Sequence, residues 1–158
     1  SSWSRTEILK PKRSSKPGGS HTELGMYDAV IAGQGHEIET FGTDCFLGVV
    51  YDPKRKIAIA FGFHCGTISA QDYIEQCLPQ VFKDLRTVMG REPDNFKAVI
   101  TGGKNLDRIT SGNLDSLEFL LEAMGITEID KRLIPDNRKR AHLRFKVGVD
   151  EKPEIKFS

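Results

Sequence analysis

The chain has 158 residues, with 23 basic and 22 acidic side chains, 38% hydrophobic residues and 8% aromatic residues. This length and balance are typical of one globular domain with a sizeable core, and they argue against two independent domains. The near-neutral charge excludes a strong global attraction to nucleic acid, and no run approaches the ~20 apolar residues of a membrane span.

Residues 1–20 differ from the rest of the chain, because they hold five basic side chains against one acidic side chain among many Ser, Pro and Gly residues. This composition predicts a flexible basic tail. We interpret it as a solvated tail in preference to a nucleic-acid-binding arm. Residues 21–158 are then expected to form a single domain.

Three cysteines, Cys45, Cys65 and Cys77, are an odd number without the CxxC spacing of a zinc site. A disulfide framework or structural zinc site is therefore not expected. Reduced thiols in a cytoplasmic protein are the first interpretation. Export as a secreted effector is the alternative, which the sequence leaves open.

The first elements that we expect along the chain are strands. Residues 26–42 mix short apolar runs with glycines, which predicts short strands joined by turns. Residues 43–51 and 57–64 are rich in Val, Ile, Phe and Ala, and the turn residues "DPKRK" between them predict a β-hairpin. Both strands are apolar on both faces, so we expect a sheet that is covered on both sides.

Helices and further strands follow. Apolar residues recur at helical spacing over 70–89, with Ser69 as the expected N-cap, Cys77 in the apolar stripe and a kink at Pro79. A buried strand then ends in a Gly pair, and a second helix is expected from about 111 to 124, with Ser111 or Asn113 near its cap. The segments "TEIDKRLI", "AHLRFKVGV" and "PEIKFS" are predicted to be closing strands. The fold class is therefore α+β, a layered α/β sandwich with a largely antiparallel sheet, a central hairpin and two main helices.

The hairpin places Cys45 opposite His64 if residues 53–56 form its loop. Directly opposed residues have Cβ atoms ~4.5–5.5 Å apart, so the imidazole could take the thiol proton and create a nucleophile. An ordinary buried cysteine beside a hydrogen-bonded histidine is the competing interpretation. Cys65 points to the opposite face of its strand and is interpreted as structural, as is Cys77.

The stretch "GTDCFLGVVYDPKRKIAIAFGFH" resembles the chemoreceptor glutamine deamidase (CheD) family, which has a cysteine at the head of a strand, "YDP" before a turn, and a histidine on the return strand. Downstream, "ITGGKNLDRITSGN" resembles the family's Gly-Gly loop and the Gly-Asn pair that follows it. The similarity runs from about residue 38 to 149. The family's fold is a layered α/β sandwich shared in outline with bacterial toxins that deamidate glutamines.

The resemblance implies a cysteine hydrolase that converts a protein glutamine to glutamate, with Cys45 as nucleophile and His64 as base and acid. It implies no cofactor and no metal. The family has a threonine six residues before the cysteine, where this chain has Glu39. The third catalytic residue is therefore expected to be Thr40, with Thr43 and Glu39 as the alternatives.

Two departures bear on activity. The histidine comes two residues later than in the family, at the same parity, and Asp44 stands directly before the cysteine, where a carboxylate disfavours a thiolate. A catalytically silent module that binds a protein partner is therefore the alternative function. The expected partner is a chemoreceptor-like or host protein, with no membrane insertion or nucleic acid, and we expect a monomer.

Overall fold

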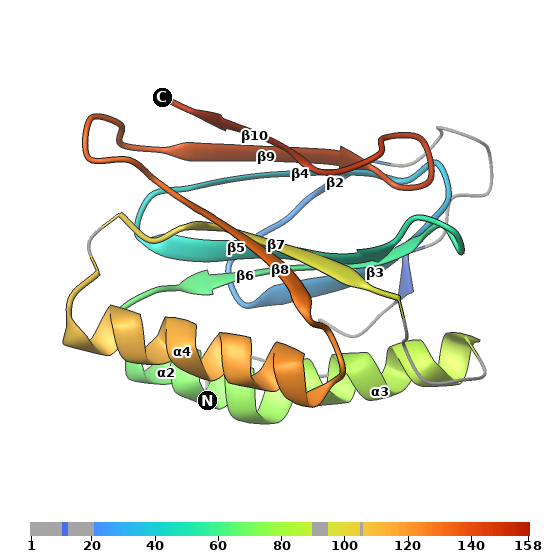
Figure 1. Ribbon diagram of the computed structural model, residues 1–158, viewed down its shortest axis with the longest axis horizontal. Coiled ribbons are helices and arrows are strands. Elements are labelled where there is room, and N and C mark those ends of the chain that lie inside the picture. Colours follow the sequence, from blue (N-terminus) through green and yellow to red (C-terminus); the bar gives the residue numbers. More distant parts are fainter. Residues whose placement is uncertain (1–10, 13–20, 90–94, 105) are drawn as a thin grey trace.

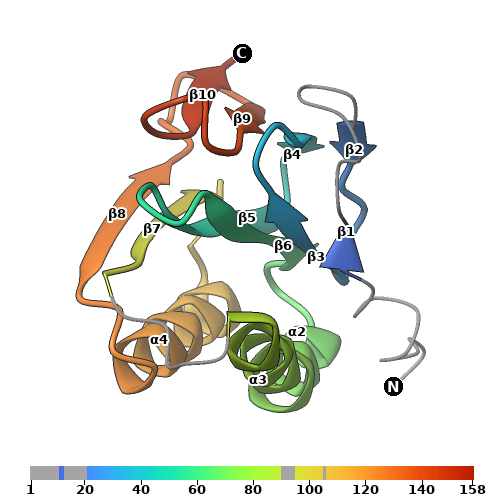
Figure 2. The same ribbon diagram turned by 90° about the vertical axis from the view of Figure 1, so that its right-hand side faces the viewer.

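A computed structural model describes residues 11–12, 21–89, 95–104 and 106–158. The chain forms three layers: helices, a six-stranded sheet and a four-stranded sheet (Figures 1 and 2). Of the predicted tail, residues 11–12 form a short strand, and residues 1–10 and 13–20 lie outside the described residues.

The six-stranded sheet is the middle layer (Figure 2). Its central pairs are antiparallel, and the pairs at both edges, β1 with β3 and β7 with β8, are parallel. In spatial order its strands are β1 (Pro11–Lys12), β3 (Asp28–Gly33), β6 (Ile57–His64), β5 (Cys45–Asp52), β7 (Lys97–Gly102) and β8 (Glu128–Leu133).

The second sheet covers the face of the first sheet that is turned away from the helices (Figure 2). Its strands, in spatial order, are β10 (Glu154–Phe157), β9 (Ala141–Lys146), β4 (Glu37–Gly42) and β2 (His21–Glu23). The predicted α+β layered sandwich with mostly antiparallel pairing is thereby confirmed. The prediction treated the strands as one sheet, whereas the chain distributes them between two.

The helical layer contains one interrupted helix and one continuous helix. α2 (Ile68–Asp72), the π-helical segment η1 (Tyr73–Cys77) and α3 (Leu78–Met89) follow one another, and α4 (Arg108–Ala123) lies beside them. Near the kink predicted at Pro79 the structure has the π-helical segment η1, which ends two residues before that proline. Because proline lacks an N–H and its ring collides with the preceding turn, a wider turn is a common accommodation.

Both predicted N-caps are corrected. Thr67 caps α2, since its Oγ1 accepts a hydrogen bond from the Ala70 N–H at 3.3 Å, so Ser69 lies inside the helix. Asp107 caps α4 by accepting from the Thr110 N–H at 2.8 Å, which places Asn113 in the helix interior. Both caps are good side-chain acceptors, and they lie two residues before Ser69 and four residues before Ser111.

Two apolar clusters fill the spaces between the three layers. Phe46, Ile59 and Phe61 face the helices, whereas Val49 and Ala60 face the second sheet. The predicted double covering of the hairpin is therefore confirmed. Cys65 and Cys77 both lie in the cluster on the helix side, as expected for structural cysteines.

Within the described ranges, the helices are too short or too polar for any of them to span a bilayer.

Candidate functional site

The β5–β6 hairpin pairs Cys45 with His64, in the register that the sequence predicted. The backbone N–H of Cys65 donates to the carbonyl of Asp44 at 3.1 Å, so the neighbouring Asp44 and Cys65 form a hydrogen-bonded pair. Pair types alternate along an antiparallel ladder, and the Cys45–His64 pair is therefore the non-hydrogen-bonded type, in which side chains approach more closely. The two candidate residues stand side by side at the open end of the hairpin.

The two side chains differ in exposure. By strand parity both project toward the second sheet, but Cys45 is only 3% exposed, whereas His64 lies at the exposed end of β6. The sulfur of Cys45 packs directly on Gly42, because a Cβ placed on Gly42 would lie 1.8 Å from Sγ. Glycine at this position is thus what gives the thiol room beneath β4.

Burial raises the pKa of the Cys45 thiol to about 11, and the negative charge of Asp44 adds to the rise. A hydrogen bond with the backbone of Thr43 acts in the opposite direction. Both upward effects disfavour the charged thiolate. At neutral pH the resting thiol is therefore protonated, and a nucleophile would form only when a base removes the proton during the reaction.

The predicted Gly pair braces the cysteine from the neighbouring strand. Gly102 and Gly103 have positive φ values of 99° and 68°. The Gly103 N–H donates to the Cys45 carbonyl at 3.0 Å, and a Cβ on Gly102 would lie 1.9 Å from that same oxygen. The pair is therefore required for close backbone contact with β5.

Asn113 secures the segment that follows His64. Its side-chain amide donates to the carbonyls of Cys65 at 2.7 Å and Thr67 at 3.3 Å, and the residue is 6% exposed. The hydroxyl of Thr67 in turn contacts the phenol of Tyr27 at 2.9 Å. Gly102, Gly103 and Asn113 thus meet the two strand ends of the hairpin, although they lie far downstream of Cys45 in the sequence.

The three candidates for a third catalytic residue occupy different places. Thr40 is buried, and its hydroxyl donates to the Leu24 carbonyl at 3.2 Å. Glu39 points away from the first sheet and its carboxylate lies 2.7 Å from the His142 ring nitrogen. Thr43 lies in the exposed turn between β4 and β5. Thr40 shares the inward face of β4 with Gly42, two residues away.

Tyr27 is the neighbour of His64 that the sequence analysis missed. Its ring and the imidazole form an edge contact, with centroids 5.5 Å apart and planes at 67°. Its φ of 59° lies in the left-handed region, which is a genuine outlier for a bulky residue. Nothing in the residue type predicts a positive φ at tyrosine.

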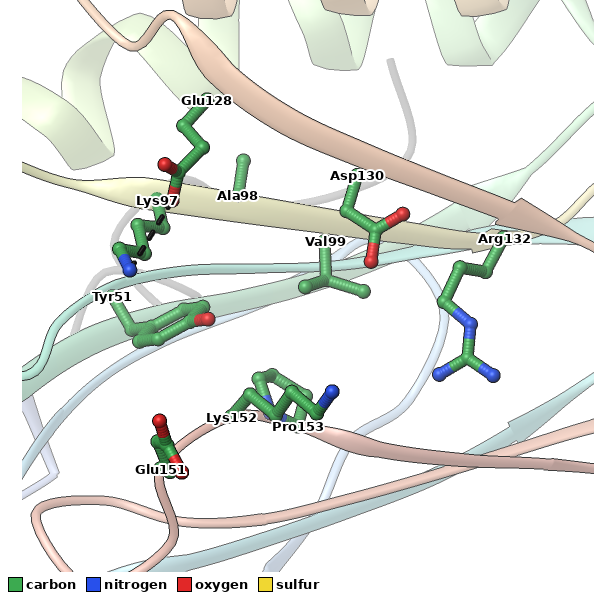
Figure 3. A pocket seen from close by; sticks show the side chains of 10 residues that line it. All are labelled: Tyr51, Lys97, Ala98, Val99, Glu128, Asp130, Arg132, Glu151, Lys152 and Pro153. Carbon is green, nitrogen blue, oxygen red and sulfur yellow. Dashed lines mark ion pairs between the residues drawn. The ribbon is translucent and has the colours of Figure 1, made fainter.

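A cavity of about 300 Å³ lies at a different place, between β7, β8 and the segment before β10 (Figure 3). Charges of both signs line it, including the Lys97–Glu128 ion pair at 3.3 Å. Tyr51, which also lines it, is six residues from Cys45 along β5, or roughly 20 Å at the usual rise per residue. The cavity is therefore separate from the Cys45–His64 pair. Within the described part of the chain, no group of three or more His, Cys, Asp or Glu side chains is arranged to hold a metal ion.

No family model matches the chain, and no curated protein matches it significantly. Among solved structures, the fold is similar to the crystal structure of the Bacillus licheniformis hypothetical protein YfiH, with 14% sequence identity and a TM-score of 0.49. That similarity covers 66% of this chain and 50% of YfiH, so the chain spans about half the length of that protein. Similarity at this level assigns no function.

Proposed function

We propose that the protein is a cysteine-dependent deamidase that hydrolyses the side-chain amide of a glutamine in a protein substrate. The observation that carries the proposal is the pairing of Cys45 with His64 at the open end of a rigid hairpin. Directly opposed strand positions have Cβ atoms about 4.5–5.5 Å apart, and this closeness of a nucleophile and a base supports covalent acyl transfer. The resemblance of the surrounding motifs to the chemoreceptor glutamine deamidases supplies the substrate class.

In the proposed reaction, the His64 imidazole takes the Cys45 thiol proton as the sulfur attacks the amide carbon. The imidazolium then returns that proton to the departing nitrogen, and ammonia leaves behind a thioester. Water, deprotonated by the same imidazole, attacks the thioester, and the proton passes back to the sulfur as glutamate is released. Concerted proton transfer is needed because burial and Asp44 hold the pKa of Cys45 near 11. The Gly103 N–H already donates to the Cys45 carbonyl, so other donors must stabilise the oxyanion.

A protein substrate is supported by exposed apolar side chains near the same end of the molecule. Ile68, at the start of α2, is 83% exposed, and Ile109, at the start of α4, is 55% exposed. α2 follows His64 by a short turn, and α4 follows the Gly102–Gly103 pair. Large exposed apolar residues that gather on one side often mark a protein-binding surface.

The alternative is a silent binding module that kept the fold, and one observation favours it. Cys45 is 3% exposed with its sulfur packed on Gly42, so the thiol is covered in the resting protein. A raised thiol pKa and a covered sulfur are also the properties of an inert structural cysteine.

Mass spectrometry of protein substrates separates the two functions. Candidate proteins, such as chemoreceptor cytoplasmic domains and host-cell proteins, are incubated with the native chain, with Cys45→Ser and with Cys65→Ser. Each deamidation adds about one dalton at a glutamine. The proposal predicts a shift with the native chain and with Cys65→Ser, and none with Cys45→Ser. If every mass stays unchanged while one of these proteins binds the chain, the deamidase proposal is wrong and the binding module is favoured.

A further inference from the structure

Tyr27 is held in an unusual backbone conformation next to His64. Its φ of 59° is disfavoured for an aromatic residue, and its N–H donates to the Gly62 carbonyl at 2.6 Å on the strand that carries His64. Strained residues of this kind persist only where the surrounding structure fixes them, and they are found disproportionately at functional sites. A tyrosine therefore stands at a position where glycine or asparagine would be less strained.

The Tyr27 side chain is fixed on three sides. Its hydroxyl lies 2.9 Å from the Thr67 hydroxyl at the cap of α2. Its ring makes edge contacts with Tyr73, at a centroid distance of 5.7 Å, and with His64, at 5.5 Å. Tyr73 is fully buried, so one neighbour of the Tyr27 ring is immobile and the other is the candidate base. The Tyr27 ring thus connects the exposed His64 imidazole to a buried residue of the core.

Among the residues that the structure describes, His64 forms no hydrogen bond or ion pair, so the aromatic contact is what restrains its ring. The residues first expected to orient it are otherwise engaged: Glu39 with His142, and Thr40 with the Leu24 carbonyl. An exposed histidine without a restraint samples several rotamers, so a fixed neighbour narrows the orientations that its ring can take.

We infer that Tyr27 is the positioning residue of the site: its ring, which packs against the buried Tyr73, sets the rotamer of His64. This role rests on the proposed function only in that His64 is the base. The positioning itself is a property of the resting protein and can be measured without a substrate.

The test compares the His64 ring resonances of the native chain with those of Tyr27→Asn and Tyr27→Phe, by NMR with labelled histidine. Asparagine accepts a positive φ, so Tyr27→Asn removes the ring without adding backbone strain. We expect ring-current shifts of His64 and cross-relaxation between the two rings in the native chain. Both should be lost in Tyr27→Asn and kept in Tyr27→Phe. The matched control is Lys56→Asn, at another positive-φ position, 56°, at the far end of the same hairpin.

On a protein substrate, Tyr27→Asn should lower kcat by about two- to tenfold, the range expected for losing one aromatic contact, with KM little changed and Tyr27→Phe near the native rate. Loss of the ring-current shifts without any detectable deamidase activity would support the positioning role and count against the proposed function. His64 resonances that are identical in the native chain and Tyr27→Asn would overturn the positioning role even if deamidation is found. Should Tyr27→Asn not fold, absence of cross-relaxation between the two rings in the native chain overturns it equally.

Discussion

Gly42 decides where the Cys45 thiol can lie. The sulfur occupies the space that a side chain on Gly42 would fill, at 1.8 Å from an added Cβ. The close approach of β4 to β5 therefore depends on one missing methyl group. Because the thiol is buried by this contact, and burial is the main cause of its raised pKa, Gly42 also controls the chemistry of Cys45.

We expect Gly42→Ala to unfold more easily than the native chain by about 1–3 kcal/mol, the usual effect of overpacking a tight contact. In a Cys45→Ala background the same change should cost much less, because the sulfur that it strikes is gone. Urea unfolding of the four proteins gives the coupling free energy, which should be at least about 1 kcal/mol. Additive effects of the two substitutions would contradict the direct contact.

At the scale of elements, the hairpin was predictable and the placement of β4 was not. The β5–β6 register follows from a four-residue loop and from strands that are apolar on both faces, so the Cys45–His64 pairing could be counted from the sequence. If β4 ran straight into β5 as one strand, residue parity would relate Thr40 and Glu39 to Cys45. In fact the chain turns at residues 43–44 and enters the other sheet, so parity does not carry across. Local pattern contains no information on which sheet a strand joins.

The helix α4 fixes the segment after His64 through Asn113. We expect Asn113→Ala to destabilise the protein by about 1–3 kcal/mol, since the carbonyls of Cys65 and Thr67 would lose their donor in a buried place. Amide hydrogen exchange in residues 65–68 should accelerate. The neighbouring Gly112→Ala is the matched comparison: an added Cβ there meets nothing within 4 Å, so the helix should gain about 0.5–1 kcal/mol. Equal effects of both substitutions would show that Asn113 acts only through helix propensity.

At the scale of the whole molecule, the layers bring three distant segments to one end. The hairpin ends, the Gly102–Gly103 turn and the start of α4 lie together on the left of Figure 1. The order and types of these elements could be predicted, because apolar periodicity and turn residues mark them. Their convergence could not, since it depends on the parallel pairing of β7 with β8 after α4 and on the packing of Gly102 against Cys45. Tyr27 was missed for the same reason: its contacts are tertiary.

The two buried thiols should make the free energy of unfolding decrease at alkaline pH. Folding raises the pKa of Cys45 to about 11 and that of Cys65 to about 12, in each case mainly through burial, from an ordinary thiol value of 9.0. Below that ordinary value both states keep the thiol protons, so stability is unaffected. Above it the unfolded chain loses protons that the folded chain retains, and the free energy of unfolding must fall as pH rises toward 11.

Each thiol should contribute a slope of up to about 1.4 kcal/mol per pH unit in this range. We therefore expect the free energy of unfolding in urea, measured under reducing conditions from pH 8 to 10.5, to fall more steeply for the native chain than for Cys45→Ala/Cys65→Ala. All other ionisable groups are the same in both proteins, so the difference between the two curves isolates the two thiols. Parallel curves would mean that Cys45 and Cys65 ionise as readily in the folded protein as in the unfolded chain. Cys45 would then be far more accessible to a base than its burial beneath Gly42 implies.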